Sequence, residues 1–223
     1  MTNCENSIPV SGSEKLAVAS ITSNIEQTYP IVYQGNAVDG KGKMTFPDGS
    51  VYEGDIVEGK KHGKGKVTFS NGVIYEGDFV EGKNREKGKL TCLTGFIYEG
   101  DIVEGKKHGK GKLTFPDGSV YEGDWVDGKK HGKGKMTLAN GDNYEGDWAV
   151  GKEHGKGKAS NSNGDNYEGD WIDGHKTGKG IYTTHDYSWE GEWIKDKPQG
   201  EGKATYTGKW KECLESAQKR RKV

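Results

Sequence analysis

The sequence has 223 residues, of which 36 are Leu, Ile, Val or Phe, and its 33 basic and 34 acidic side chains nearly cancel. This aliphatic share lies below the roughly 20% that a conventional core needs, so an ordinary two-layer globular domain is disfavoured. Disordered chains combine low hydrophobicity with high net charge and few aromatic residues, whereas this chain has a net charge of −1, 11 Tyr and 6 Trp. Together with 37 glycines, the composition favours a repetitive fold that buries little aliphatic surface.

Targeting signals are not visible in the sequence. No run approaches the roughly 20 apolar residues of a membrane span, and no basic segment followed by an apolar run marks a signal peptide. The three cysteines, Cys4, Cys92 and Cys213, match neither a disulfide framework nor a metal motif, and they are expected to be reduced. We therefore predict a cytoplasmic protein, free or associated with the cytoskeleton or a membrane.

The first segment, residues 1–32, is rich in Ser, Thr and Asn. It fits two interpretations, a flexible tail or a cover for the first edge strand of the fold that follows. The residues alone do not decide between them.

An internal repeat fills about residues 33–210. Weaker copies of its motif lie at Tyr33, Trp189 and Tyr206. A fixed period of this length predicts about eight copies of one supersecondary unit. The tetrapeptide YEGD begins every 23 residues, at Tyr52, Tyr75, Tyr98, Tyr121, Tyr144 and Tyr167.

Each repeat is predicted to form one β-hairpin. Counting the tyrosine as position 0, alternation with period two marks strands over about positions 0–5 and 12–17. The first turn contains Glu-Gly-Lys-Lys, and the second contains Pro-Asp-Gly or Asn-Gly, as at 47–49. Such a second turn suits a type I turn closed by a glycine with positive φ.

A register follows from the parity of the two strands. If position 0 pairs with 17, then 2 meets 15 and 4 meets 13, so Tyr, Gly and Trp share one face and Glu, Asp and Lys the other. Position 3 would then face position 14, pairing Asp55 with Lys66 and Asp124 with Lys135. The prediction is a sheet with one aromatic face and one zwitterionic face.

The pattern Y-E-G-D-W-x-x-G-K-x-H-G-x-G at 121–134 and 144–157 resembles the membrane occupation and recognition nexus (MORN) repeat. The resemblance covers most of the chain. It implies an all-β fold, an elongated, twisted, single antiparallel sheet of successive hairpins, with aromatic rings and glycines lining a groove. Residues 211–223 would add a short C-terminal capping helix or a basic tail.

The aromatic residues are the candidate binding site. Position 4 is Ile or Phe in the first half of the array and Trp in the second. Tyr and Trp are favoured anchors of protein interfaces, and a fold with so little interior is expected to expose much of its aromatic surface. The predicted partner-binding groove consists of Tyr121, Trp125, Tyr144, Trp148, Tyr167, Trp171 and Trp193.

Other recurrent polar residues do not point to chemistry. The histidines at one position of four repeats (His62, His108, His131 and His154) would be stepped roughly 10 Å apart along the sheet, too far to share one zinc ion. The repeated Glu and Asp of YEGD look like a solvated face, and catalytic carboxylates need differing environments. We predict no catalytic residues, no metal site and no cofactor.

The basic end of the chain leaves two interpretations open. Residues Trp210, Cys213, Leu214 and Ala217 have helical spacing and could cover the last sheet edge. Lys219, Arg220, Arg221 and Lys222 could instead contact anionic lipid weakly, at about 1 kcal/mol per basic residue.

The sequence therefore predicts a non-catalytic interaction scaffold in a cytoskeletal, ciliary or other large assembly. Its partner would be a protein that lays a helix or an extended segment in the aromatic groove. A homodimer is a further outcome, and nucleic acid is not expected as a partner. The alternative function is a membrane-surface or phosphoinositide-binding module.

Overall fold

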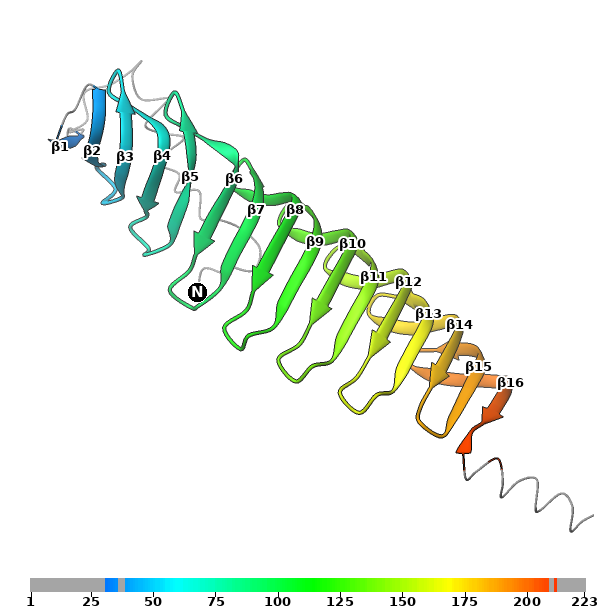
Figure 1. The fold of residues 1–223 in the computed structure, drawn as a ribbon. Coiled ribbons are helices and arrows are strands. Elements are labelled where there is room, and N and C mark those ends of the chain that lie inside the picture. Colours follow the sequence, from blue (N-terminus) through cyan, green and yellow to red (C-terminus); the bar gives the residue numbers. More distant parts are fainter. Residues whose placement is uncertain (1–30, 36–38, 209–210, 212–223) are drawn as a thin grey trace, which may run out of the picture. The chain divides into compact units, whose positions relative to one another are not determined.

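The computed structural model describes residues 31–35, 39–208 and 211. Its strands form one antiparallel sheet in which each strand pairs with its neighbours in chain order (Figure 1). The all-β fold of successive hairpins predicted from the sequence is thereby confirmed. The strands are β1 Val32–Gly35, β2 Asp39–Thr45, β3 Val51–Val57, β4 Lys60–Thr68, β5 Ile74–Val80, β6 Lys83–Thr91, β7 Ile97–Val103, β8 Lys106–Thr114, β9 Val120–Val126, β10 Lys129–Thr137, β11 Asn143–Ala149, β12 Lys152–Ser160, β13 Asn166–Ile172, β14 His175–Thr183, β15 Tyr187–Ile194 and β16 Lys197–Tyr206.

The described part of the chain divides into two compact units. The first contains the residues up to 117 together with 124–129, and the second contains 118–123 together with the residues from 130 onward. The N-terminal segment 1–30 and the predicted capping helix and tail at 212–223 lie outside the described residues.

Two kinds of turn connect the strands. From the repeat at Tyr52 onward, the turn inside the repeat has two residues with positive φ, as at Glu58 (50°) and Gly59 (73°), which is the signature of a type I′ hairpin. The turn between repeats is closed by a glycine such as Gly49 at φ 83°, and there the Phe46 N–H donates to the Ser50 carbonyl at 2.8 Å. The predicted glycine with positive φ in the second turn is confirmed.

The predicted register within the hairpin is wrong by two residues. Tyr52 pairs with Val67, position 15 rather than 17, and beyond Gly54 the pairing jumps to Asp55 opposite His62. The jump leaves Gly63 and Lys64 as extra residues. Gly63 adopts φ 52°, so this segment forms a β-bulge that alternation alone could not predict.

The predicted ion pairs change with the register. Asp55 pairs with Lys41 of the preceding repeat at 2.9 Å, not with Lys66. Asp124 likewise pairs with Lys110, and Lys135 pairs with Glu145 at 3.5 Å. These ion pairs therefore link one repeat to the next instead of closing a single hairpin.

The predicted separation of two faces is confirmed by the burial of alternate residues. In β3, Tyr52 and Ile56 are buried while Glu53 and Val57 are exposed. The same alternation recurs in the first strand of later repeats, as in β13. Buried residues at positions 0 and 4 form the core of each unit, and in the first unit position 15 joins them, as at Val67 and Leu113.

One expectation about cysteine is wrong. Cys92 was expected to be a reduced thiol, and it is disulfide-bonded in the structure.

Candidate functional site: the aromatic face

Paired glycines make room for the tyrosine ring of each YEGD motif. Gly146 and Gly157 face each other across β11 and β12. A Cβ atom on Gly157 would lie 2.3 Å from the Tyr144 hydroxyl, and one on Gly146 would lie 2.5 Å from the Gly157 Cα. The ring therefore lies directly over the backbone, which only glycine permits at these two positions.

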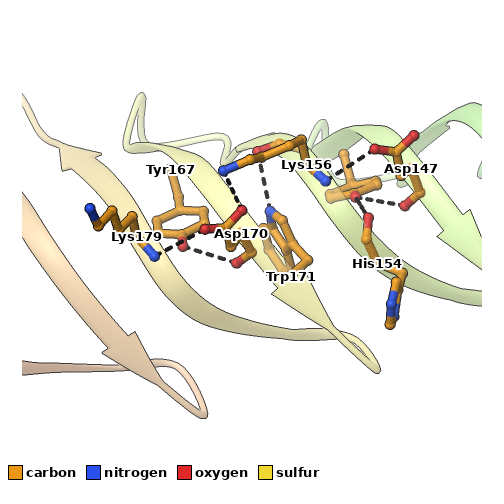
Figure 2. Close-up of polar contacts among 9 residues, drawn as sticks. Asp147, His154, Lys156, Tyr167, Asp170, Trp171 and Lys179 are labelled. Atoms are coloured by element: carbon orange, nitrogen blue, oxygen red, sulfur yellow. Dashed lines mark hydrogen bonds and ion pairs between the residues drawn. The ribbon is translucent and has the colours of Figure 1, made fainter.

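The tyrosine hydroxyl is tied to the bulge. Tyr144 donates to the Asp147 carbonyl at 2.8 Å, and the His154 carbonyl is a second acceptor at 3.4 Å (Figure 2). Burial raises the pKa of Tyr144, with smaller contributions from the charges of Glu153 and Asp147. The tyrosine is thus a neutral donor that fixes the bulge to the strand.

Tryptophans alternate with these tyrosines along the second unit. Trp148 packs edge-to-face against Tyr121 and Tyr144, with ring centroids 5.1 and 5.2 Å apart. Trp171 does the same with Tyr144 and Tyr167, at 5.0 and 5.3 Å. Such ring pairs stabilise by about 0.5–1.5 kcal/mol beyond the area they bury.

The indole nitrogens connect successive repeats. The Trp171 Nε1–H donates to the Gly157 carbonyl at 3.2 Å (Figure 2), and the Trp148 Nε1–H donates to the Gly134 carbonyl at 3.0 Å. In the first unit Trp125 donates to the Gly111 carbonyl at 3.1 Å. The isoleucine and phenylalanine copies in earlier repeats have no ring N–H for such a bond.

The structure buries the predicted groove residues much more than expected. The expectation that the aromatic surface would be largely exposed is wrong, because each ring lies on glycine backbone and packs sideways against its neighbours. Whether a partner contacts these rings stays a prediction. The exposed fractions are 0% for Tyr121, 2% for Trp125, 5% for Tyr144, 4% for Trp148, 1% for Tyr167, 7% for Trp171 and 6% for Trp193.

A row of lysines on the same face was missed by the sequence analysis. Position 9 lies opposite position 4 across the two-residue turn, as Lys61 does opposite Ile56, so it shares the aromatic face. Lys107 is only 2% exposed, and its ammonium nitrogen lies 4.7 Å from the Trp125 ring centroid. Parity counted across the turn would have revealed this row, but lysine is ordinarily assigned to the solvent side.

On the zwitterionic face, an aspartate of the repeat binds both the β-bulge and a lysine of the preceding repeat. The Asp170 carboxylate accepts from the Lys179 backbone N–H at 3.1 Å and pairs with the Lys156 ammonium of the preceding repeat (Figure 2). These bonds, led by that from Lys156, lower the pKa of Asp170. Asp147 has a lowered pKa for the same reason, with Lys133 as its leading partner.

These carboxylates do not resemble a pair for proton transfer. Asp147 and Asp170 have matching environments, whereas catalytic acids and bases need pKa values pushed apart. The histidines stand singly opposite such aspartates, as His154 does opposite Asp147. Within the described residues, no three His, Cys, Asp or Glu side chains form a group that could hold a metal ion.

Lys219, Arg220, Arg221 and Lys222 lie outside the described residues. The part of the chain that the structure describes contains no helix whose length and hydropathy would let it cross a bilayer.

The solved structures that match this chain include two domains in complex with peptides, both with TM-scores below 0.5. The TCP domain of Drosophila melanogaster SAS-4, in complex with a proline-rich motif of Ana2, matches with a TM-score of 0.46 and 15% identity over 83% of this chain and 96% of that chain. The TCP10 domain of Danio rerio CPAP, with a peptide of STIL, matches with a TM-score of 0.24 and 16% identity over 80% and 99%.

The comparison with family models identifies the repeat. No curated protein matches the sequence. The model for the MORN repeat matches residues 33–51, 52–74, 75–95, 98–120, 121–143, 144–166, 167–188 and 189–211. These segments account for nearly all of the array, and those that begin at 52, 75, 98, 121, 144 and 167 follow the 23-residue period. The chain belongs to the MORN repeat family.

Proposed function

We propose that this protein is a non-catalytic interaction scaffold, and that a partner protein binds the aromatic face of the second unit through a helix or an extended segment. The observation that carries the proposal is that long side chains, not a second layer of strands or helices, cover this face in the described residues. Apolar sheet faces are normally covered by another packed layer. A partner segment can take that place.

Lysine side chains are the part of this cover that can move. The Lys130 ammonium lies 5.0 Å from the Tyr121 ring centroid and 4.8 Å from that of Trp148. A lysine stem has several rotatable bonds and can follow apolar surface or leave it. A partner that displaces these stems gains contact with Tyr and Trp rings, the residue types that dominate interface energetics.

The absence of catalysis is part of the same proposal. Lowered aspartate pKa values and raised tyrosine pKa values keep these groups in one protonation state near neutral pH. General acids and bases work best with a pKa near the operating pH. The repeated environments therefore favour binding over proton transfer.

The test uses tryptophan substitutions that the array itself tolerates. Trp148→Ile and Trp171→Ile introduce isoleucine, which other repeats have at the same position as Ile56 and Ile102. Lys158→Ser changes the opposite face. A partner identified by affinity purification from native cells is then titrated against each purified protein. We expect both tryptophan variants to weaken binding at least about tenfold, since hot-spot residues contribute about 2 kcal/mol or more, and Lys158→Ser to leave it unchanged.

Two outcomes would reject the proposal. Unchanged affinity of both folded tryptophan variants would show that the partner binds elsewhere. Flotation of the wild-type chain with anionic vesicles, unchanged when Lys219, Arg220, Arg221 and Lys222 are all replaced, would favour the membrane-surface alternative. The array gives little reason to expect this second outcome, because several lysines of its charged face are paired with carboxylates, as Lys133 is with Asp147.

A further inference from the structure

The tyrosine of one repeat and the position-4 ring of the next form a recurring cation site. Lys107 has its ammonium nitrogen 5.9 Å from the Tyr98 ring centroid and 4.7 Å from that of Trp125. Lys176 is placed likewise, 4.9 Å from Tyr167 and 5.7 Å from Trp193. An ammonium within about 6 Å of a ring centroid is attracted by the ring quadrupole. The fold therefore uses one geometry several times to hold a primary ammonium group.

The repeat that begins at Tyr144 departs from this pattern. Its rings are equivalent, since Tyr144 and Trp171 pack edge-to-face with centroids 5.0 Å apart. Position 9, however, is Glu153, which lies opposite Trp148 as the lysines lie opposite their own position-4 residues. Here the fold combines the two rings with a carboxylate instead of an ammonium.

No internal cation balances this carboxylate in the described part of the chain. There Glu153 forms no ion pair, and no lysine or arginine lies over Tyr144 or Trp171. The Glu153 side chain is half-buried, and its Oε2 lies 3.3 Å from the point where a Cβ of Gly174 would stand. Its charge is close enough to Tyr144 to raise the pKa of that phenol.

We propose that Glu153, Tyr144 and Trp171 form a binding site for the side-chain ammonium of a lysine in the partner protein. The ligand supplies the group that four of the other repeats supply themselves with a lysine at position 9. An unmodified ammonium fits best, because its N–H groups can donate to the Glu153 carboxylate while its charge faces the rings.

Access is compatible with a ligand that enters from the carboxylate side. Trp171 is 7% exposed, the largest value among the predicted groove rings, and Glu153 is only half-buried. The lysine would pair with the carboxylate and cover the exposed rim of the indole. The inference rests on the proposed function, since it assigns one contact on the face where the partner segment is placed.

The test follows the indole N–H of Trp171 by NMR during titration with a hexalysine peptide. The resonance is assigned by its loss in Trp171→Phe. Glu153→Lys installs the lysine of the sister repeats and should fill the site internally. Glu168→Lys is the matched control, because it makes the same charge change at a residue on the opposite face of the same unit.

We expect the wild-type indole resonance to shift and saturate, and Glu168→Lys to behave similarly. Glu153→Lys should abolish the shift and unfold at the same temperature as the wild type or higher. Glu153→Gln should weaken binding by about tenfold or more, the scale of one hydrogen bond to a charged group.

Several results would overturn the site. These are no saturable shift in the wild type, an undiminished shift in Glu153→Lys or Glu153→Gln, and tighter binding of a hexapeptide of trimethyl-lysine. Failure of Glu153→Lys to fold would show that the repeats are not equivalent here. A native partner that depends on Trp148 but not on Glu153 would reject this site and leave the proposed function standing.

Discussion

At the scale of single residues, the fold depends on positions where one side chain type fits and others do not. Gly157 lies beneath the Tyr144 ring, where a Cβ would be only 2.5 Å from ring carbons. Position 6, the first residue of the type I′ turn, is more permissive. It is Glu or Asp in several copies, as at Asp173 with φ 52°, but Val150 has the same φ.

Val150 should be a weak point of its turn. A β-branched side chain in the left-handed region costs about 1 kcal/mol or more, and Asp tolerates that region better. Val150 is 62% exposed, so replacing it removes little buried apolar surface. We expect Val150→Asp to raise the free energy of unfolding by about 1 kcal/mol, measured by urea denaturation. The reciprocal change Asp173→Val should lower it by a similar amount, and equal stability of all three proteins would contradict this account.

At the scale of the hairpin, the β-bulge is held by a carboxylate that also forms an ion pair. The Asp170 carboxylate accepts from the Lys179 N–H and pairs with Lys156. Lys156 in turn donates its own backbone N–H to Asp147 at 3.1 Å. Each lysine of this kind therefore closes its own bulge and binds the aspartate of the next repeat.

This arrangement predicts that the folded chain loses stability in acid. The pKa values of Asp147 and Asp170 are lowered in the folded chain, so their ionised forms stabilise the fold above the unfolded pKa of about 3.9. That stabilisation should be lost as the pH falls through the lower folded values. Asp170→Asn removes one of these contributions.

Urea titrations between pH 7 and pH 2.5 should show this difference. We expect Asp170→Asn to be less stable than the wild type at pH 7, with the two curves converging in acid. Asp173→Asn in the adjoining turn is the control for replacing an aspartate by an amide. Parallel curves for Asp170→Asn would show that the carboxylate does not act through its charge.

The hairpins and their faces could be predicted because period-two alternation and turn glycines are local signals. The register could not, because the bulge at Gly63 and Lys64 inserts two residues without disturbing the visible alternation. The lysine row was missed for a related reason. Lys107 is buried by its partners in space, Tyr98 and Trp125, and neither is near it in the sequence.

At the scale of the array, successive repeats of the second unit pair in the same way. Gly132 pairs with Trp148 at one junction, and Gly155 pairs with Trp171 at the following one. Repeat arrays of this kind derive their stability from repeats and nearest-neighbour junctions. A junction should therefore accept any repeat that carries the same residues at the paired positions.

Deletion of one full period tests this equivalence. Removing residues 144–166 joins Asn143 to Tyr167, and Gly132 should then pair with Trp171. We expect a folded sheet with the wild-type circular dichroism per residue and a smaller urea m-value, because less surface is exposed on unfolding. Removing only 144–154 is the control. It deletes most of β11, the turn and the start of β12, so the rest of β12 would follow β10 directly and the match between glycine pairs and tyrosine rings would be lost. A full-period deletion that unfolds as readily as this control would show that the repeats are individually adapted to their places in the chain, and that the comparison of Glu153 with its sister lysines has no structural basis.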